Sequence, residues 1–169
     1  FQLHQLSTGE LLRKEIKEKT KLGQEIETIM NSGNLVSDKI VSDLIENYLS
    51  NETFSNRLIF DGYPRNLIQV KNLDNLLKKY NQKIDIVLKL SVSLETIKKR
   101  ISERKTLEKR EDDNEKTAIK RFEMYEKNIK NVIEFYKESN LLTVVNGEKP
   151  ISEISNEISD LIEGIKGWL

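Results

Sequence analysis

The sequence has no cysteine, only two prolines, one histidine and one tryptophan, and no net charge. Without cysteine it has neither a disulfide scaffold nor a cysteine-ligated zinc site. Its 28 basic residues are balanced by 28 acidic ones, which argues against a nucleic-acid binder with a broad basic surface but not against a local phosphate pocket. No apolar run approaches the length of a bilayer-spanning helix. We therefore expect a cytosolic protein that binds neither nucleic acid nor membrane.

The 169 residues suit a single domain of ordinary size with a real hydrophobic core. Short apolar runs predict strands at about residues 3–6, 58–60, 84–90 and 141–145. Helical spacing of apolar residues lies between and after these runs, with a short charged break expected at 105–109. Alternation of this kind favours an α/β fold, with a parallel sheet covered by helices on both faces.

Arginine is scarce beside lysine, so each arginine invites a functional explanation. A guanidinium can hold a phosphate through two parallel hydrogen bonds and can stack on a base, which an ammonium cannot do. Arg100 and Arg104 stand four residues apart and share a helix face, and Arg110 and Arg121 are separated by about three turns. Codon bias, or a solvated charged face, would explain the same pattern without a ligand.

Residues 58–65 are an apolar run that ends in Asp61, Gly62, Tyr63, Pro64 and Arg65. The run predicts a buried strand that delivers polar groups to its carboxyl end, where open α/β sheets bind ligands. Asp61 suits a magnesium-bound water, and Arg65 suits a phosphate. Taken alone, the pattern is better explained by a plain turn in which Asp61 caps the next helix and Arg65 is solvated, because such turns are common.

Two further polar residues are open to simple explanations. Thr8 stands at the start of an expected helix, where its hydroxyl would cap the backbone or meet a ligand, and capping is the better local prediction. His4, the only histidine, lies in an expected strand and is better explained by packing or hydrogen bonding than by catalysis.

Four segments, read together, resemble the adenylate kinases: residues 6–13, residues 33–36, residues 60–65 followed by Gln69, and residues 110–113 followed by Arg121. Their order and spacing match across nearly the whole chain. The resemblance implies a P-loop-kinase-like fold and reversible transfer of a phosphoryl group from magnesium-ATP to AMP, which yields two ADP. ATP, AMP and ADP are thus the expected partners, Mg²⁺ the expected cofactor, and a monomer the expected state.

The resemblance also assigns roles on the AMP side. Gln69 would face the adenine edge, and Arg13 and Arg65 would hold the α-phosphate. Asp61 would order magnesium through water. The whole set implied for AMP is Thr8, Arg13, Gly33, Asn34, Leu35, Val36, Gly62, Tyr63, Pro64, Arg65, Gln69, Arg110 and Arg121.

On the ATP side, the resemblance implies that Arg100 stacks on adenine, that Arg104 reaches the phosphates, and that Lys149 lies in the turn whose backbone meets the base. The implied catalytic arginines are Arg65, Arg104, Arg110 and Arg121. Such a site agrees with the chemistry, because phosphoryl transfer needs alignment and fixed positive charge rather than a side-chain nucleophile.

Water exclusion requires closing segments, and the resemblance places them at about residues 7–36 over AMP and in a short lid at about 104–113, within a single domain of residues 1–169. Longer family members carry a small extra domain at the lid, sometimes with zinc. This chain lacks the residues and the cysteines for it, so we expect no zinc.

One family feature is missing, because no G-x-x-x-x-G-K-[ST] phosphate loop occurs in the sequence. Residues 1–6 resemble the second strand of the family, so the central first strand is expected to be absent. Its loss would leave two neighbouring strands with unpaired edges and an apolar slot between them. We expect little or no kinase activity from these 169 residues as they stand.

Two alternatives remain at this point. A kinase for UMP, CMP or GMP is the nearest, although Thr8 and Gln69 favour AMP by resemblance. A non-catalytic nucleotide-binding or scaffold domain that has lost its phosphate loop is the other.

Overall fold

The computed structural model describes residues 1–108 and 115–165. Strands and helices alternate along it as expected. Their order is β1 (His4–Ser7), α1 (Thr8–Lys17), α2 (Lys21–Asn31), α3 (Asp38–Leu49), a 3₁₀ turn (Glu52–Phe54), β2 (Leu58–Asp61), α4 (Leu67–Lys79), β3 (Val87–Ser91), α5 (Leu94–Glu108), α6 (Glu115–Glu138), β4 (Leu142–Asn146) and α7 (Ile151–Glu163).

Two predicted boundaries were wrong. The strand expected from residue 84 begins only at Val87, so residues 84–86 form a connector. The charged break expected at 105–109 is helical as far as Glu108, because these residues include neither glycine nor proline to stop α5. Charge by itself does not end a helix.

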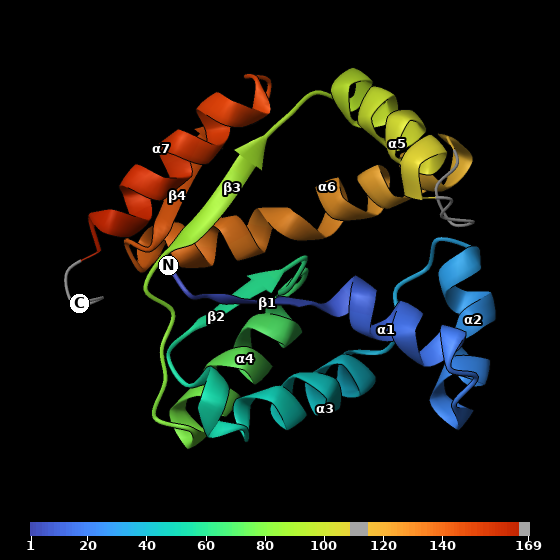
Figure 1. The fold of residues 1–169 in the computed structure, drawn as a ribbon, viewed down its shortest axis with the longest axis horizontal. Coiled ribbons are helices and arrows are strands. Elements are labelled where there is room, and N and C mark those ends of the chain that lie inside the picture. Colours follow the sequence, from blue (N-terminus) through green and yellow to red (C-terminus); the bar gives the residue numbers. More distant parts are fainter. Residues whose placement is uncertain (109–114, 166–169) are drawn as a thin grey trace.

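The strands form two parallel pairs rather than one continuous sheet. In the first pair His4 lies opposite Leu58 and Ser7 opposite Asp61, and in the second pair Val87 lies opposite Leu142. In the described part of the chain, the facing edges of β2 and β3 are not bonded to each other or to a further strand. Figure 1 shows β1 and β2 on one side of α6 in that view, and β3, β4 and α7 on the other.

A cavity of about 1110 Å³ lies between the two pairs, and its lining includes Phe60 of β2 and Leu88 and Leu90 of β3. The lining also includes Ile97 of α5 and Val132 of α6. The unpaired edges and the apolar slot expected from the sequence are therefore both present. The two strand pairs are held together by helices.

Each strand pair has its own core, and α4 contributes to both. Leu6, Ile26, Ile45 and Leu73, none more than 1% exposed, belong to the core around β1 and β2. Val70, Val132 and Tyr136 form the second, against which residues of β3 and β4 pack. Because Leu73 and Val70 lie on the same helix, α4 connects the halves.

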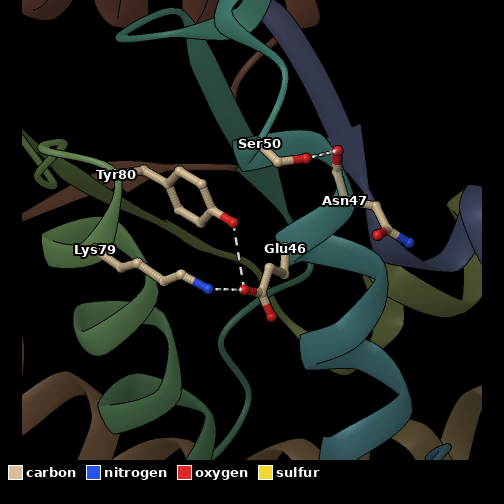
Figure 2. A network of polar contacts seen from close by, with 5 residues as sticks. All are labelled: Glu46, Asn47, Ser50, Lys79 and Tyr80. Carbon is tan, nitrogen blue, oxygen red and sulfur yellow. Dashed lines mark hydrogen bonds and ion pairs between the residues drawn. The ribbon is translucent and has the colours of Figure 1, made fainter.

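A polar network fixes α3 against the end of α4 (Figure 2). Glu46 of α3 accepts a 2.5 Å hydrogen bond from Lys79 Nζ and a 3.3 Å bond from the Tyr80 hydroxyl. The bond and the charge of Lys79 hold the pKa of Glu46 below its usual value, and Glu46 raises the pKa of Lys79 in return. The pair is exposed, so its net contribution to stability is small.

Candidate active site

The candidate site forms where β1 and β2 end side by side. Ser7 lies opposite Asp61, so α1, which begins at Thr8, starts beside the loop that begins at Gly62. Ligands of open parallel sheets bind at this carboxyl edge. A pocket there is lined by most of the residues predicted to hold AMP, namely Thr8, Arg13, Asn34, Leu35, Val36, Gly62, Tyr63, Arg65, Gln69 and Arg121.

Thr8 does not cap its helix, so the local prediction favouring a cap was wrong. Ser7 is the N-cap residue of α1, and no side-chain hydrogen bond caps this helix. Thr8 is instead the first helical residue, 5% exposed, and lines the pocket. Its hydroxyl group is not used in a helix cap and is therefore available to contact a ligand in the pocket. His4 packs edge to face against Phe54, which agrees with the packing role expected for it.

Arg65 is half-buried and surrounded by charge, which rules out the interpretation of a solvated turn residue. Its Nε donates to the Gly62 carbonyl oxygen at 2.6 Å. Burial lowers the pKa of the Arg65 guanidinium, the positive charge of Arg121 and that of Arg13 lower it further, and Asp61 opposes them. Three guanidinium groups in such proximity favour binding of a multiply charged anion.

Asn66, and not Asp61, caps α4, because its Oδ1 accepts from the Gln69 backbone N–H at 2.8 Å. Asp61 accepts a 2.9 Å hydrogen bond from Gln5 Nε2 of the neighbouring strand. Among the described residues there is no cluster of three histidine or acidic side chains able to enclose a metal. A lone carboxylate nevertheless suits Mg²⁺, which keeps several waters and takes other ligands from substrate phosphates.

Gln69 is buried, and its side-chain amide is held at both ends. Its Oε1 accepts from the Arg65 backbone N–H at 2.7 Å, and its Nε2 donates to Asp38 Oδ1 at 2.7 Å. The Tyr63 hydroxyl donates to the Gln69 carbonyl oxygen. Burial, and secondly the negative charge of Asp38, raise the pKa of Tyr63, which therefore remains protonated.

The segment 33–36 reaches the site from the end of α2 and is fixed against α6. Gly33 has φ +74°, a conformation that favours glycine, and a Cβ there would lie 3.0 Å from Thr117 Cγ2. Lys120 Nζ of α6 donates to the Ser32 carbonyl oxygen at 2.9 Å. These contacts bring the 33–36 segment next to the helix that carries Arg121.

Two of the three residues predicted for the ATP side, Arg100 and Lys149, lie at the turn after β4. Arg100 Nη2 donates to the Gly147 carbonyl oxygen at 2.7 Å, and Lys149 pairs with Glu157 of α7 at 2.8 Å. Glu148 accepts from the Ser93 backbone N–H and from Thr96 Oγ1, which joins this turn to the start of α5. The hydrogen bonds from Thr96 and Ser93 hold the pKa of Glu148 below its usual value.

Three other predicted site residues lie outside the pocket and the turn described above, and a fourth is not among the described residues. Gly33 and Pro64 line the neighbouring large cavity rather than the pocket. Arg104 lies one turn beyond Arg100 on α5, and Arg110 falls outside the described residues. Asp38, Asn66 and Glu148 were missed as site residues, since an acid or amide at a helix start or in a turn is too common to attract notice.

A parallel α/β fold with an arginine-lined pocket at the carboxyl edge of its strands is the arrangement expected of a nucleoside monophosphate kinase. The family model for adenylate kinase matches residues 1–141. The adenylate kinase of Pelagibacter ubique is 38% identical to this chain, over 94% of this chain and 87% of its own length. That of Prochlorococcus marinus strain MIT 9515 is 43% identical, over 90% of this chain and 81% of its own length. The chain belongs to the adenylate kinase family.

A third relative, the adenylate kinase of Xanthomonas campestris strain B100, is 38% identical over 96% of this chain and 87% of its own length. These similarities support adenylate kinase function and favour neither a kinase for another nucleotide nor a scaffold. No helix in the described ranges is both long and apolar enough to cross a bilayer.

Proposed function

We propose that this chain binds AMP in the pocket between the start of α1 and the end of β2, as the acceptor of a phosphoryl group from ATP. The observation that carries the proposal is the convergence of Arg13, Arg65 and Arg121 on that pocket. Their combined charge suits the α-phosphate of AMP and the phosphoryl group that moves onto it. Gln69 then reads the base.

The donor, ATP, lies on the other side of the transferred group. Arg100, already held by the Gly147 carbonyl, is positioned to stack on the ATP adenine beside the turn that carries Lys149. Arg104 and Arg110 approach the phosphates when the lid at 104–113 closes, and the segment 7–36 closes over AMP. Closure excludes water, so ATP is not hydrolysed before transfer.

Transfer itself requires little side-chain chemistry. Arg65 and Arg121 orient the acceptor phosphate in line with the donor and stabilise the negative charge that spreads over the transferred oxygens. Asp61 would hold Mg²⁺ through water, and the ion would supply positive charge to neutralise the donor phosphates. No residue of this set has to accept a covalent phosphate, which fits a site dominated by arginine.

Isothermal titration of the purified 169-residue chain with AMP tests the acceptor site. This readout does not depend on the phosphate loop that the sequence lacks. We expect one AMP per chain, and at least about tenfold weaker binding of UMP, CMP and GMP, which corresponds to a difference of about 1.4 kcal/mol. Equal binding of all four nucleotides, or no AMP binding, would contradict the proposal.

A further inference from the structure

The side-chain amide of Gln69 has two protein partners of opposite chemical type. Asp38 presents a carboxylate, which only accepts hydrogen bonds when it is ionised, and receives the Gln69 Nε2 donor at 2.7 Å. The backbone N–H of Arg65 only donates, and is received by Gln69 Oε1 at 2.7 Å. The orientation of the amide is therefore determined by chemistry at both ends.

Rotating the amide by 180° would replace both bonds with repulsive contacts. The Gln69 oxygen would face the Asp38 carboxylate, and its NH₂ group would face the Arg65 N–H. Gln69 is 3% exposed, so solvent offers its amide little compensation. Leaving buried polar groups unpaired in this way is costly.

Asp38 is itself held in place. It lies in the first turn of α3, where the helix dipole favours a negative charge, and Ser37 caps the same helix. Asn66 Nδ2 donates to Asp38 Oδ1 at 3.1 Å, while Asn66 Oδ1 caps α4. The Asp38 carboxylate is thus fixed between α3, which carries it, and α4, which carries Gln69.

The hydrogen bonds to Asp38 and from Arg65 leave the Gln69 amide with one further N–H and one further oxygen lone pair. Adenine presents a donor at its 6-amino group and an acceptor at N1, whereas a 6-oxopurine presents an acceptor at O6 and a donor at N1. An amide of fixed orientation complements one of these edges and opposes the other. A freely rotating amide accepts both.

We propose that Asp38 is the positioning residue that makes the pocket select a 6-aminopurine over a 6-oxopurine, by locking the orientation of the Gln69 amide. This inference rests on the proposed function, in which Gln69 meets the base of AMP. Asp38 need not touch the nucleotide, and no purely local feature of the sequence assigns it this role.

The test compares AMP with IMP, which has the same size and differs by a 6-oxo group and a proton on N1. Dissociation constants for both are measured by calorimetry on the wild type, Asp38→Asn and Asp43→Asn. Asp38→Asn preserves shape, but its amide supplies a donor as well as an acceptor, so it removes the repulsion that Asp38 sets against a flipped Gln69. Asp43, which pairs with Lys39 on the exposed part of α3, provides the matched control.

In the wild type we expect AMP to bind more than tenfold more tightly than IMP. We expect Asp38→Asn to reduce that ratio about tenfold, because the variant loses a hydrogen bond to a charged group. We expect Asp43→Asn to leave the ratio unchanged. Because both ligands are measured on one preparation, partial unfolding of a variant does not alter the ratio. Asp38→Glu, which retains the carboxylate, is measured as a second variant and should recover part of the selectivity.

Each alternative outcome has a distinct meaning. If Asp38→Asn weakens AMP and IMP equally, Asp38 supports the fold alone and this inference is wrong, while the proposed function stands. If the wild type binds AMP and IMP equally, Gln69 does not read the base, and both the proposed AMP selectivity and this inference fail.

Discussion

Arg65 and Gly62 are joined by a 2.6 Å hydrogen bond from the arginine Nε to the glycine carbonyl oxygen. A Cβ atom on Gly62 would lie 2.9 Å from Arg65 Nη2, and Gly62 has φ +68°. The glycine therefore serves two purposes, since it permits the turn and leaves space for the guanidinium. The orientation of Arg65, which we propose binds the phosphate, depends on the residue three positions before it.

We expect Gly62→Ala to weaken AMP binding about tenfold and to lower the free energy of unfolding by about 1–2 kcal/mol. The added methyl group displaces the Arg65 guanidinium and strains the turn. Calorimetry measures the first effect and chemical denaturation the second. Gly164→Ala is the matched control, because Gly164 has φ −70° and a Cβ there would make only ordinary contacts. Wild-type affinity in Gly62→Ala would show that Arg65 is not held by this turn.

We expect Arg65→Ala to reduce AMP affinity roughly 10- to 100-fold, because it removes a bidentate, charge-assisted contact with phosphate. Binding of adenosine, which has no phosphate, should change little. Arg57→Ala serves as the control, since Arg57 lies just before the opposite end of β2 and donates to Gln2 Oε1 at 3.1 Å. Equal losses for AMP and adenosine would place Arg65 outside the phosphate site.

Substitution of Leu73 tests whether the buried face of α4 packs as described. Leu73 is 1% exposed, and Leu73→Ala should lower the free energy of unfolding by about 2–5 kcal/mol through the lost burial and the cavity that remains. Ile68 lies on the same helix and is 61% exposed, so Ile68→Ala should have a much smaller effect. Urea titration followed by circular dichroism compares the two. Similar losses would contradict the burial of this face of α4.

The Glu46–Lys79 pair should make a small, pH-dependent contribution to stability. Lys79 lowers the pKa of Glu46 in the folded protein, so the stabilisation is fully present above the pKa of glutamate in the unfolded chain, about 4.3. It is lost as the pH falls through the lower pKa of the folded state. Glu46→Gln should thus melt slightly below the wild type at pH 7, and the difference should shrink toward pH 3.

Thermal melts of the wild type, Glu46→Gln and Glu27→Gln at both pH values provide this comparison. Glu27 is an exposed acid of α2 and controls for the loss of one surface charge. A difference between Glu46→Gln and the wild type that grows toward pH 3 would contradict the sign of this linkage.

Much of the candidate site was predictable because its residues sit beside recognisable local signals. The apolar run before Asp61 predicted the strand, and the motif around Arg65 predicted its pocket. The predicted burial of that strand was wrong, because Ile59 of β2 is 43% exposed. Thr8 was misjudged, since the neighbouring Ser7 is an equally good N-cap residue and local sequence does not decide between them. Asp38 was missed because its partner Gln69 lies 31 residues away.

The sequence by itself determined the order of strands and helices, the carriers of positive charge and the chemistry that they serve. The order of the elements and the positions of the charges follow from local periodicity and from side-chain type, whereas the chemistry follows from the resemblance to the adenylate kinases. The tertiary structure alone decided that α4 contributes to both cores and that Asp38 accepts a hydrogen bond from the Gln69 amide. Each of these depends on contacts between distant parts of the chain, which packing of the whole molecule selects and no local pattern encodes.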